Sequence, residues 1–119
     1  MKLPGPDHPI EISQEGARVR VFFAGRTVAD TTRALTLKEA RYPSVYYISR
    51  ADADMALLTR TAHTTHCPYK GEASYFTISA DGRTAQNAVW SYEAPYPAMA
   101  EIKDHLAFYP DRVDETKVG

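Results

Sequence analysis

Side chains that can do chemistry are concentrated between residues 63 and 76, where the sequence reads HTTHCPYKGEASYF. Two histidines lie here beside the only cysteine, and four residues are candidate catalytic groups: His63, His66, Cys67 and Glu72. All four are also possible metal ligands. Structural zinc usually takes two ligand pairs from separate turns, and this chain has no second pair. We therefore predict no metal and no cofactor.

Cys67 is a candidate nucleophile, because a neighbouring imidazolium favours the reactive thiolate of a cysteine. In the alternative interpretation, a lone cysteine packs as a small buried hydrophobe. Pro68 biases Cys67 towards an extended backbone, in which side chains 66 and 67 point in different directions. The sequence leaves both roles open.

The same segment can form a pocket for an anion or for proton transfer. Arg41 and Lys70 supply positive charge, and the flexible backbone of Gly71 suits the approach of a phosphate or carboxylate. Glu72 and one of the two histidines would then transfer protons. In the alternative, Lys70 is a solvated surface lysine and Gly71 simply makes a turn.

Aromatic residues are the second notable feature, with eight tyrosines and one tryptophan in the chain. We expect Tyr46, Tyr69 and Trp90 to line the walls of a pocket for a planar ligand, such as a base or another heterocycle. Alternatively, the aromatic residues build the core and an interface, with their hydroxyls hydrogen-bonded at the surface.

Most of the chain reads as short strands that must position these residues. Val19, Val21 and Phe23 alternate with Arg18 and Arg20, which is typical of a strand with one buried face. Further strands are predicted over the ranges 26–31, 35–38, 45–48, 73–79, 83–92 and 105–109. Long helices between the strands are missing, so we predict a mainly β fold: an antiparallel sandwich or open barrel with two short helices.

Turns and helix ends have their own signals. Asp81-Gly82 marks a β-hairpin. Ser49 is a candidate N-cap for a short helix over residues 50–57, whose first turns carry acidic side chains. A second short helix is predicted over residues 97–102, where proline takes the first helical position.

The chain is expected to be a single β domain over residues 10–113. An extended, proline-rich N-terminal arm precedes it at residues 1–9, and a polar tail follows at residues 114–119. Within the domain, the segment between Leu58 and Ala73 is predicted to be a loop that carries the site.

The composition of the chain limits the classes of molecule that it is expected to bind. The 119 residues carry a net charge of -1, so no global positive field favours nucleic acid or an anionic membrane. The sequence contains no membrane-spanning apolar run and no signal peptide, and a single cysteine allows no internal disulfide. We expect a cytoplasmic protein with a small-molecule ligand or a second copy of itself as partner.

Four segments together resemble a bacterial and fungal family of small domains, catalogued as domain of unknown function four-two-seven and labelled nucleotidyltransferase-like. The segments are RYPSVYY at 41–47, HTTHCPYKGEASY at 63–75, NAVWSY at 87–92 and HLAFYPDRV at 105–113. The resemblance covers nearly the whole chain, and the HTTHCPYKGEASY stretch is long and unusual.

The resemblance implies a β-tent topology, as in the Mss4-like group that includes methionine sulfoxide reductase B and the ligand-binding domain of cereblon. Many members of that group hold zinc through two cysteine pairs, which a chain with Cys67 alone does not have. The family label implies nucleotidyl transfer, in which Asp52 and Asp54 would hold a divalent metal beside the phosphate. If they begin a helix, both aspartates are better explained as first-turn partners of the helix dipole.

Three functional hypotheses follow. The leading one is a polar and aromatic pocket for a small anionic or heterocyclic ligand, with enzymatic activity left open. The second is a protein-interaction or homodimerising module, in which His63, His66 and Glu72 are buried and bonded to one another. The third is the nucleotidyl transfer that the family label suggests.

Overall fold

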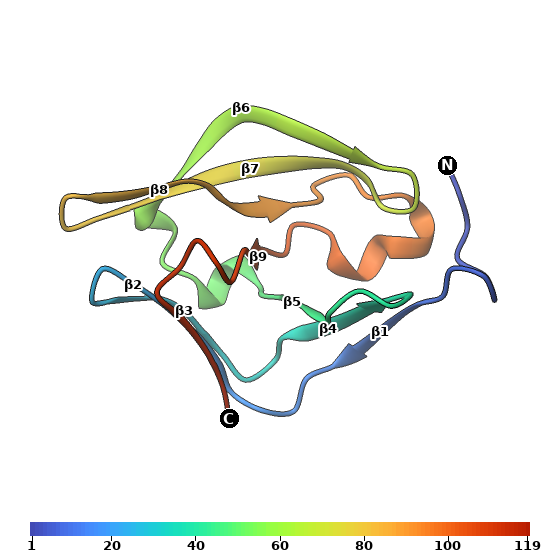
Figure 1. Ribbon diagram of the computed structural model, residues 1–119, viewed down its shortest axis with the longest axis horizontal. Helices are drawn as coiled ribbons and strands as arrows, with labels where there is room; N and C mark the ends of the chain where they lie inside the picture. The colour runs from blue at the N-terminus through green and yellow to red at the C-terminus, as the bar shows by residue number, and fades with distance from the viewer.

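The computed structural model describes residues 1–119 and contains ten β-strands in three antiparallel sheets (Figure 1). The helical content is limited to three short 3-10 segments. This confirms the predicted fold class: mainly β, antiparallel and open, with short helices. None of the helical segments has the length and apolar character needed to cross a lipid bilayer.

The largest sheet has the strand order β6-β7-β8-β9 and lies along the upper side of the molecule in Figure 1. Asp81 and Gly82 connect β7 to β8 with φ values of 49° and 80°, the left-handed conformations of a tight hairpin turn, as predicted. The strands are β6 (Leu58–Cys67), β7 (Gly71–Ala80), β8 (Arg83–Ser91) and β9 (Ala107–Phe108).

The segment between Leu58 and Ala73 was predicted to be a loop, and this prediction is wrong. The segment forms most of a β-hairpin. β6 pairs with β7 on both sides of an irregularity between Arg60 and Thr64. Only residues 68–70 form the turn. The strand was missed because β6 is exposed along most of its length, so it lacks the apolar alternation that reveals a half-buried strand.

The other two sheets have three strands each, in the orders β1-β4-β5 and β10-β2-β3. β1 was not predicted, and the polar tail ends in β10, which adds an edge strand beside β2. The strands are β1 (Ile10–Gln14), β2 (Val19–Phe23), β3 (Arg26–Thr31), β4 (Leu35–Glu39), β5 (Val45–Tyr47) and β10 (Glu115–Val118).

The first predicted helix is two 3-10 turns, η1 (Arg50–Asp52) and η2 (Met55–Leu57). Ser49 caps the first turn as predicted, since its hydroxyl accepts a hydrogen bond from the backbone N–H of Ala51 at 3.3 Å. Ala53 is extended and pairs with the sheet containing β3, which interrupts the helix. The second helix is confirmed as η3 (Pro97–Ile102), again in 3-10 form.

The core is divided into two hydrophobic clusters. The larger one, of sixteen buried residues, packs the sheet β10-β2-β3 against β6, β7 and β8 around side chains such as Val19 and Ile78. The smaller one, of eight residues, joins β4 and β5 to β7, β9 and η3. Tyrosines Tyr47, Tyr75 and Tyr92 belong to the smaller cluster, and they carry polar hydroxyls into this part of the interior.

Candidate functional site

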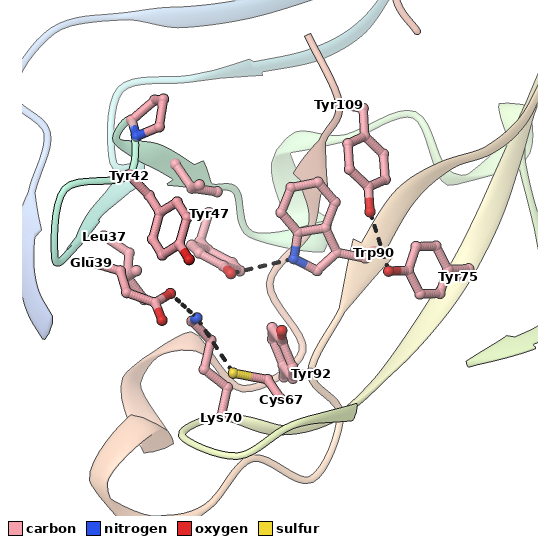
Figure 2. A pocket seen from close by; sticks show the side chains of 12 residues that line it. Leu37, Glu39, Tyr42, Tyr47, Cys67, Lys70, Tyr75, Trp90, Tyr92 and Tyr109 are labelled. Carbon is pink, nitrogen blue, oxygen red and sulfur yellow. Dashed lines mark hydrogen bonds and ion pairs between the residues drawn. The ribbon is translucent and has the colours of Figure 1, made fainter. Parts of the chain in front are cut away.

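A cavity of about 380 Å³ lies between the sheet β1-β4-β5 and the sheet β6-β7-β8-β9, beside the β6–β7 turn (Figure 2). Aromatic side chains form most of its wall, and three polar groups are placed at one end. The lining residues are Leu37, Glu39, Tyr42, Pro43, Val45, Tyr47, Cys67, Lys70, Tyr75, Trp90, Tyr92 and Tyr109.

The β6–β7 turn holds Lys70 at the end of this cavity. Gly71 follows it with φ +108°, a conformation that residues with a side chain rarely adopt. The backbone C=O of Lys70 accepts a hydrogen bond from the N–H of Tyr96 at 3.0 Å, and the C=O of Pro68 accepts one from the N–H of Lys2 at 2.7 Å. The turn is therefore fixed by two distant parts of the chain.

Lys70 is only 6% exposed and forms an ion pair with Glu39 of β4. The second carboxylate oxygen of Glu39 contacts Nε2 of His8 at 2.7 Å. Burial alone would raise the pKa of Glu39, but the hydrogen bonds from Lys70 and His8 outweigh burial and hold this pKa below its usual range. Glu39 is thus an ionised carboxylate that balances the charge of Lys70.

The sulfur of Cys67 faces Lys70 and not a histidine. Lys70 Nζ donates a hydrogen bond to Cys67 Sγ at 3.7 Å (Figure 2). His66 is exposed, because neighbouring side chains on a strand point to opposite faces. The predicted divergence of side chains 66 and 67 is confirmed, and the partner of the thiol is an ammonium group.

Trp90 forms the middle of the aromatic wall. Its indole N–H donates to the hydroxyl of Tyr47 at 3.3 Å, and its ring lies 4.5 Å from the ring of Tyr109, centroid to centroid. The hydroxyls of Tyr75 and Tyr109 are 3.2 Å apart, and burial, followed by this hydrogen bond, raises the pKa of Tyr109 to about 12. The Tyr109 phenol is therefore neutral near pH 7.

Tyr92 is only 7% exposed, yet its hydroxyl forms no hydrogen bond within the protein. In Figure 2 this hydroxyl points into the space between Trp90 and Cys67. Burial raises the pKa of Tyr92 far above its usual range, so the phenol keeps its proton and can donate it in a hydrogen bond. The hydroxyl oxygen itself is accessible from the cavity, so a bound ligand can form a hydrogen bond with it.

Several sequence-predicted site residues lie outside the cavity. Arg41, His63, His66 and Glu72 are exposed and do not line it. His63 packs its ring against Tyr75 at 4.6 Å, whereas His66 and Glu72 lie opposite each other on β6 and β7. The three residues that the interaction-module hypothesis requires to be buried are thus on the surface.

The predicted wall residues are distributed over three places. Trp90 lines the cavity as expected. Tyr69 stacks on His8 beside it, with ring centroids 4.1 Å apart. Tyr46 lines a second, more apolar cavity of about 250 Å³, which shares Val45 and Trp90 with the first.

Glu39 was not among the predicted site residues, although its position in the sequence indicates a charge on an apolar strand face. Leu35, Leu37 and Glu39 are alternate residues of β4, so they share one face of the strand. A carboxylate on the apolar face of a strand needs a cationic partner, because burying an unpaired charge is costly. His8 and Tyr92 offered no comparable signal, since their positions depend on contacts between distant segments.

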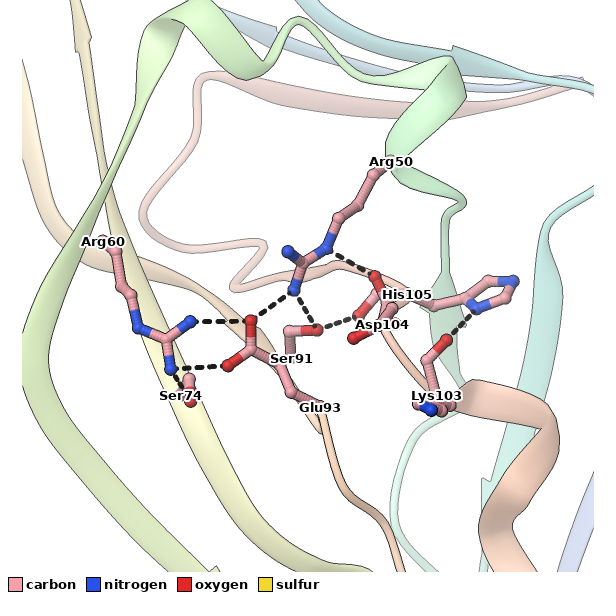
Figure 3. Close-up of polar contacts among 8 residues, drawn as sticks. All are labelled: Arg50, Arg60, Ser74, Ser91, Glu93, Lys103, Asp104 and His105. Carbon is pink, nitrogen blue, oxygen red and sulfur yellow. Dashed lines mark hydrogen bonds and ion pairs between the residues drawn. The ribbon is translucent and has the colours of Figure 1, made fainter.

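A separate polar cluster around Glu93 has a structural explanation (Figure 3). Arg60 and Arg50 donate to the Glu93 carboxylate at 2.7 and 2.9 Å, and Arg50 also donates to the backbone C=O of Asp104 at 2.7 Å. The hydrogen bond from Arg60 outweighs burial and, with those from Arg50 and Ser74, lowers the pKa of Glu93 to about 2. This cluster ties η1 to β6 and to the segment after β8.

The two aspartates considered for nucleotidyl transfer are engaged with arginines. Asp52 accepts hydrogen bonds from Arg33 at 2.7 Å and from Thr31 at 2.8 Å, and Asp54 lies 4.0 Å from Arg26. No three His, Cys, Asp or Glu side chains are grouped in a way that could hold a metal ion.

The chain matches a known protein family. A family model named NTP_transf_9 and described as "Domain of unknown function (DUF427)" matches residues 11–119. No curated protein matches the chain.

Proposed function

Since the chain belongs to the family described as domain of unknown function DUF427, we propose from its own cavity that it binds a small planar molecule, a heterocycle with both hydrogen-bond donors and acceptors. The observation that carries this proposal is the aromatic cavity of about 380 Å³ with the Lys70–Glu39 pair at its end. Cavities of this size and composition are typical of small-molecule sites.

The aromatic wall supports the choice of a planar ligand. Trp90 contacts both Tyr47 and Tyr109, which holds these rings in place before any ligand enters. A flat apolar surface held in this way binds a flat ring with little loss of side-chain entropy.

The polar end favours a heterocycle over a free anion. Lys70 is already neutralised by Glu39, so a second anion would compete with a half-buried carboxylate for the same ammonium. A neutral ring with a donor and an acceptor can instead use the Glu39 carboxylate, the Lys70 ammonium and the Tyr92 hydroxyl together. A free thiol at this end suits a reducing compartment, so a cytoplasmic location is part of the proposal.

A thermal-shift screen tests the proposal. The panel contains adenine, uracil, nicotinamide and indole as planar probes, with inorganic phosphate, glucose 6-phosphate and ATP with magnesium as anionic probes. A ligand at about a hundred times its Kd stabilises the folded protein by about 2.7 kcal/mol, which gives a clear shift in Tm. We expect at least one planar probe to raise Tm and the simple anions to have no effect.

A shift with phosphate or glucose 6-phosphate alone would restore the anion hypothesis. A shift that requires both nucleotide and magnesium would favour nucleotidyl transfer. If no probe acts and the protein sediments as a dimer, the interaction-module hypothesis would replace the pocket.

A further inference from the structure

We infer that Cys67 is a nucleophile, and that the cavity hydrolyses a planar substrate carrying an ester or carboxamide group. This inference rests on the proposed binding function and adds a reaction to it. It comes from the juxtaposition of a thiol, an ammonium and a carboxylate at one end of the cavity: Cys67, Lys70 and Glu39.

The three groups are connected in a row by hydrogen bonds. Lys70 Nζ donates to Cys67 Sγ at 3.7 Å and to Glu39 Oε1, and His8 holds the other oxygen of Glu39 at 2.7 Å. A cation beside a thiol is the setting in which nucleophilic cysteines occur, and a carboxylate in the same chain can accept a proton. All three side chains line the cavity, so a bound substrate can reach them.

Tyr92 supplies a second, independent indication of a ligand at this place. Its side chain is 7% exposed, its hydroxyl has no partner in the protein, and in Figure 2 the hydroxyl points into the space between Trp90 and Cys67. A protonated phenol in this position can donate to a substrate carbonyl oxygen, where negative charge develops when a thiol adds to the carbon.

The acylation step balances as follows. Lys70 first gives a proton to Glu39 and then, as a neutral amine, takes the proton of the Cys67 thiol while Sγ forms a bond to the carbonyl carbon. The carbonyl oxygen gains an electron pair and accepts the hydrogen bond from Tyr92. The bond from carbon to the leaving nitrogen or oxygen then breaks, and the leaving group takes the proton back from Glu39 through Lys70.

Hydrolysis of the resulting thioester uses the same groups. Water adds to the carbonyl carbon and gives its proton to Glu39 through Lys70. The carbon–sulfur bond breaks, and the sulfur recovers that proton. The net reaction consumes one ester or amide and one water, and it releases a carboxylic acid and an alcohol or amine.

Alkylation by iodoacetamide tests the nucleophile directly, since Cys67 is the only cysteine and intact mass reports the site. We expect Cys67 to react about tenfold faster than glutathione at pH 7. The double variant Lys70→Met with Glu39→Gln, which leaves no unpaired charge, should react at least about tenfold more slowly than the wild type. Lys103→Met, at an exposed lysine, is the matched control and should react like the wild type. Equal rates in the wild type and the double variant would overturn the inference.

Turnover of 4-nitrophenyl acetate tests the hydrolysis. We expect a burst of 4-nitrophenol, an acetyl adduct on Cys67 in the mass spectrum, and a loss of about a hundredfold in rate in Cys67→Ser. An unchanged rate in Cys67→Ser would overturn the reaction.

The two proposals fail in distinguishable ways. If planar probes still raise the Tm of wild type and Cys67→Ser while neither alkylation nor acylation depends on Lys70, binding stands and the nucleophile is wrong. If no probe raises the Tm of the wild type, the proposed binding function is wrong as well.

Discussion

His8 stacks on Tyr69 with ring centroids 4.1 Å apart and an angle of 5° between the planes, while its Nε2 contacts the Glu39 carboxylate at 2.7 Å. One side chain of the N-terminal arm thus touches both the β6–β7 turn and Glu39, the half-buried acid of the cavity. The arm is therefore part of the site, although its sequence reads as an extended leader to the domain.

Replacing His8 should loosen this end of the cavity. His8→Ala removes a hydrogen bond to a charged group and a ring stack, so we expect the free energy of unfolding in urea to fall by about 2 kcal/mol. Asp7→Ala, at the exposed neighbouring position, should change it by less than about 0.5 kcal/mol. Equal effects of the two variants would show that the arm does not support the site.

Neutralising Lys70 alone should lower the free energy of unfolding more than neutralising both partners of the ion pair. Lys70→Met leaves the half-buried Glu39 carboxylate without its lysine partner, at an expected loss of about 2 kcal/mol in unfolding free energy. Adding Glu39→Gln should recover most of that loss. A double variant no more stable than Lys70→Met would mean that the pair does not interact as described.

Tyr42 and Arg41 provide a matched pair at the rim of the cavity. Both are exposed, Tyr42 by 62%, but only Tyr42 lines the cavity. Tyr42→Ala should weaken binding of an active planar probe by about tenfold, because one stacking surface is lost. Arg41→Ala should stay within about twofold. Both variants should unfold like the wild type, and calorimetric titration measures the affinities. The opposite order would favour the anion hypothesis.

The Glu93 cluster makes a prediction for acid stability. The folded-state pKa of Glu93 is about 2, below the ordinary value of 4.5, so its contribution to stability is complete above about pH 4.5. It should be lost as pH falls from 4.5 towards 2. Glu93→Gln should therefore destabilise the protein by about 2 kcal/mol at pH 7 and by progressively less below pH 4.5. Glu101→Gln, at an exposed acid, is the control. Urea unfolding across this pH range gives the measurement.

Local patterns predicted the strands whose faces differ in burial. Val19, Val21 and Phe23 alternate with polar residues, and β2 lies where that alternation placed it. The turn at Asp81 and Gly82 followed from two residues that adopt positive φ readily. These features depend on neighbouring residues, which the sequence shows directly.

The site could be predicted only in part, because it depends on pairings across the chain. The segment around Cys67 and Lys70 was identified from its residue types, but Glu39 is 31 positions from Lys70 and Tyr92 lines the same cavity from the segment just after β8. The pairing of β6 with β7 also turns His66 and Glu72 outward. No local signal in the sequence indicates this orientation, because β6 lacks apolar alternation.

Trp90 is placed so that its fluorescence reports on the cavity. The chain has one tryptophan and eight tyrosines. The Trp90 ring forms the middle of the cavity wall, and its N–H donates to the hydroxyl of Tyr47 at 3.3 Å. Excitation at the red edge of the protein's absorption band therefore produces emission from Trp90 alone, in the wall of the cavity. A planar ligand stacked there would quench or shift that fluorescence, so occupancy and exchange rates can be followed without any label.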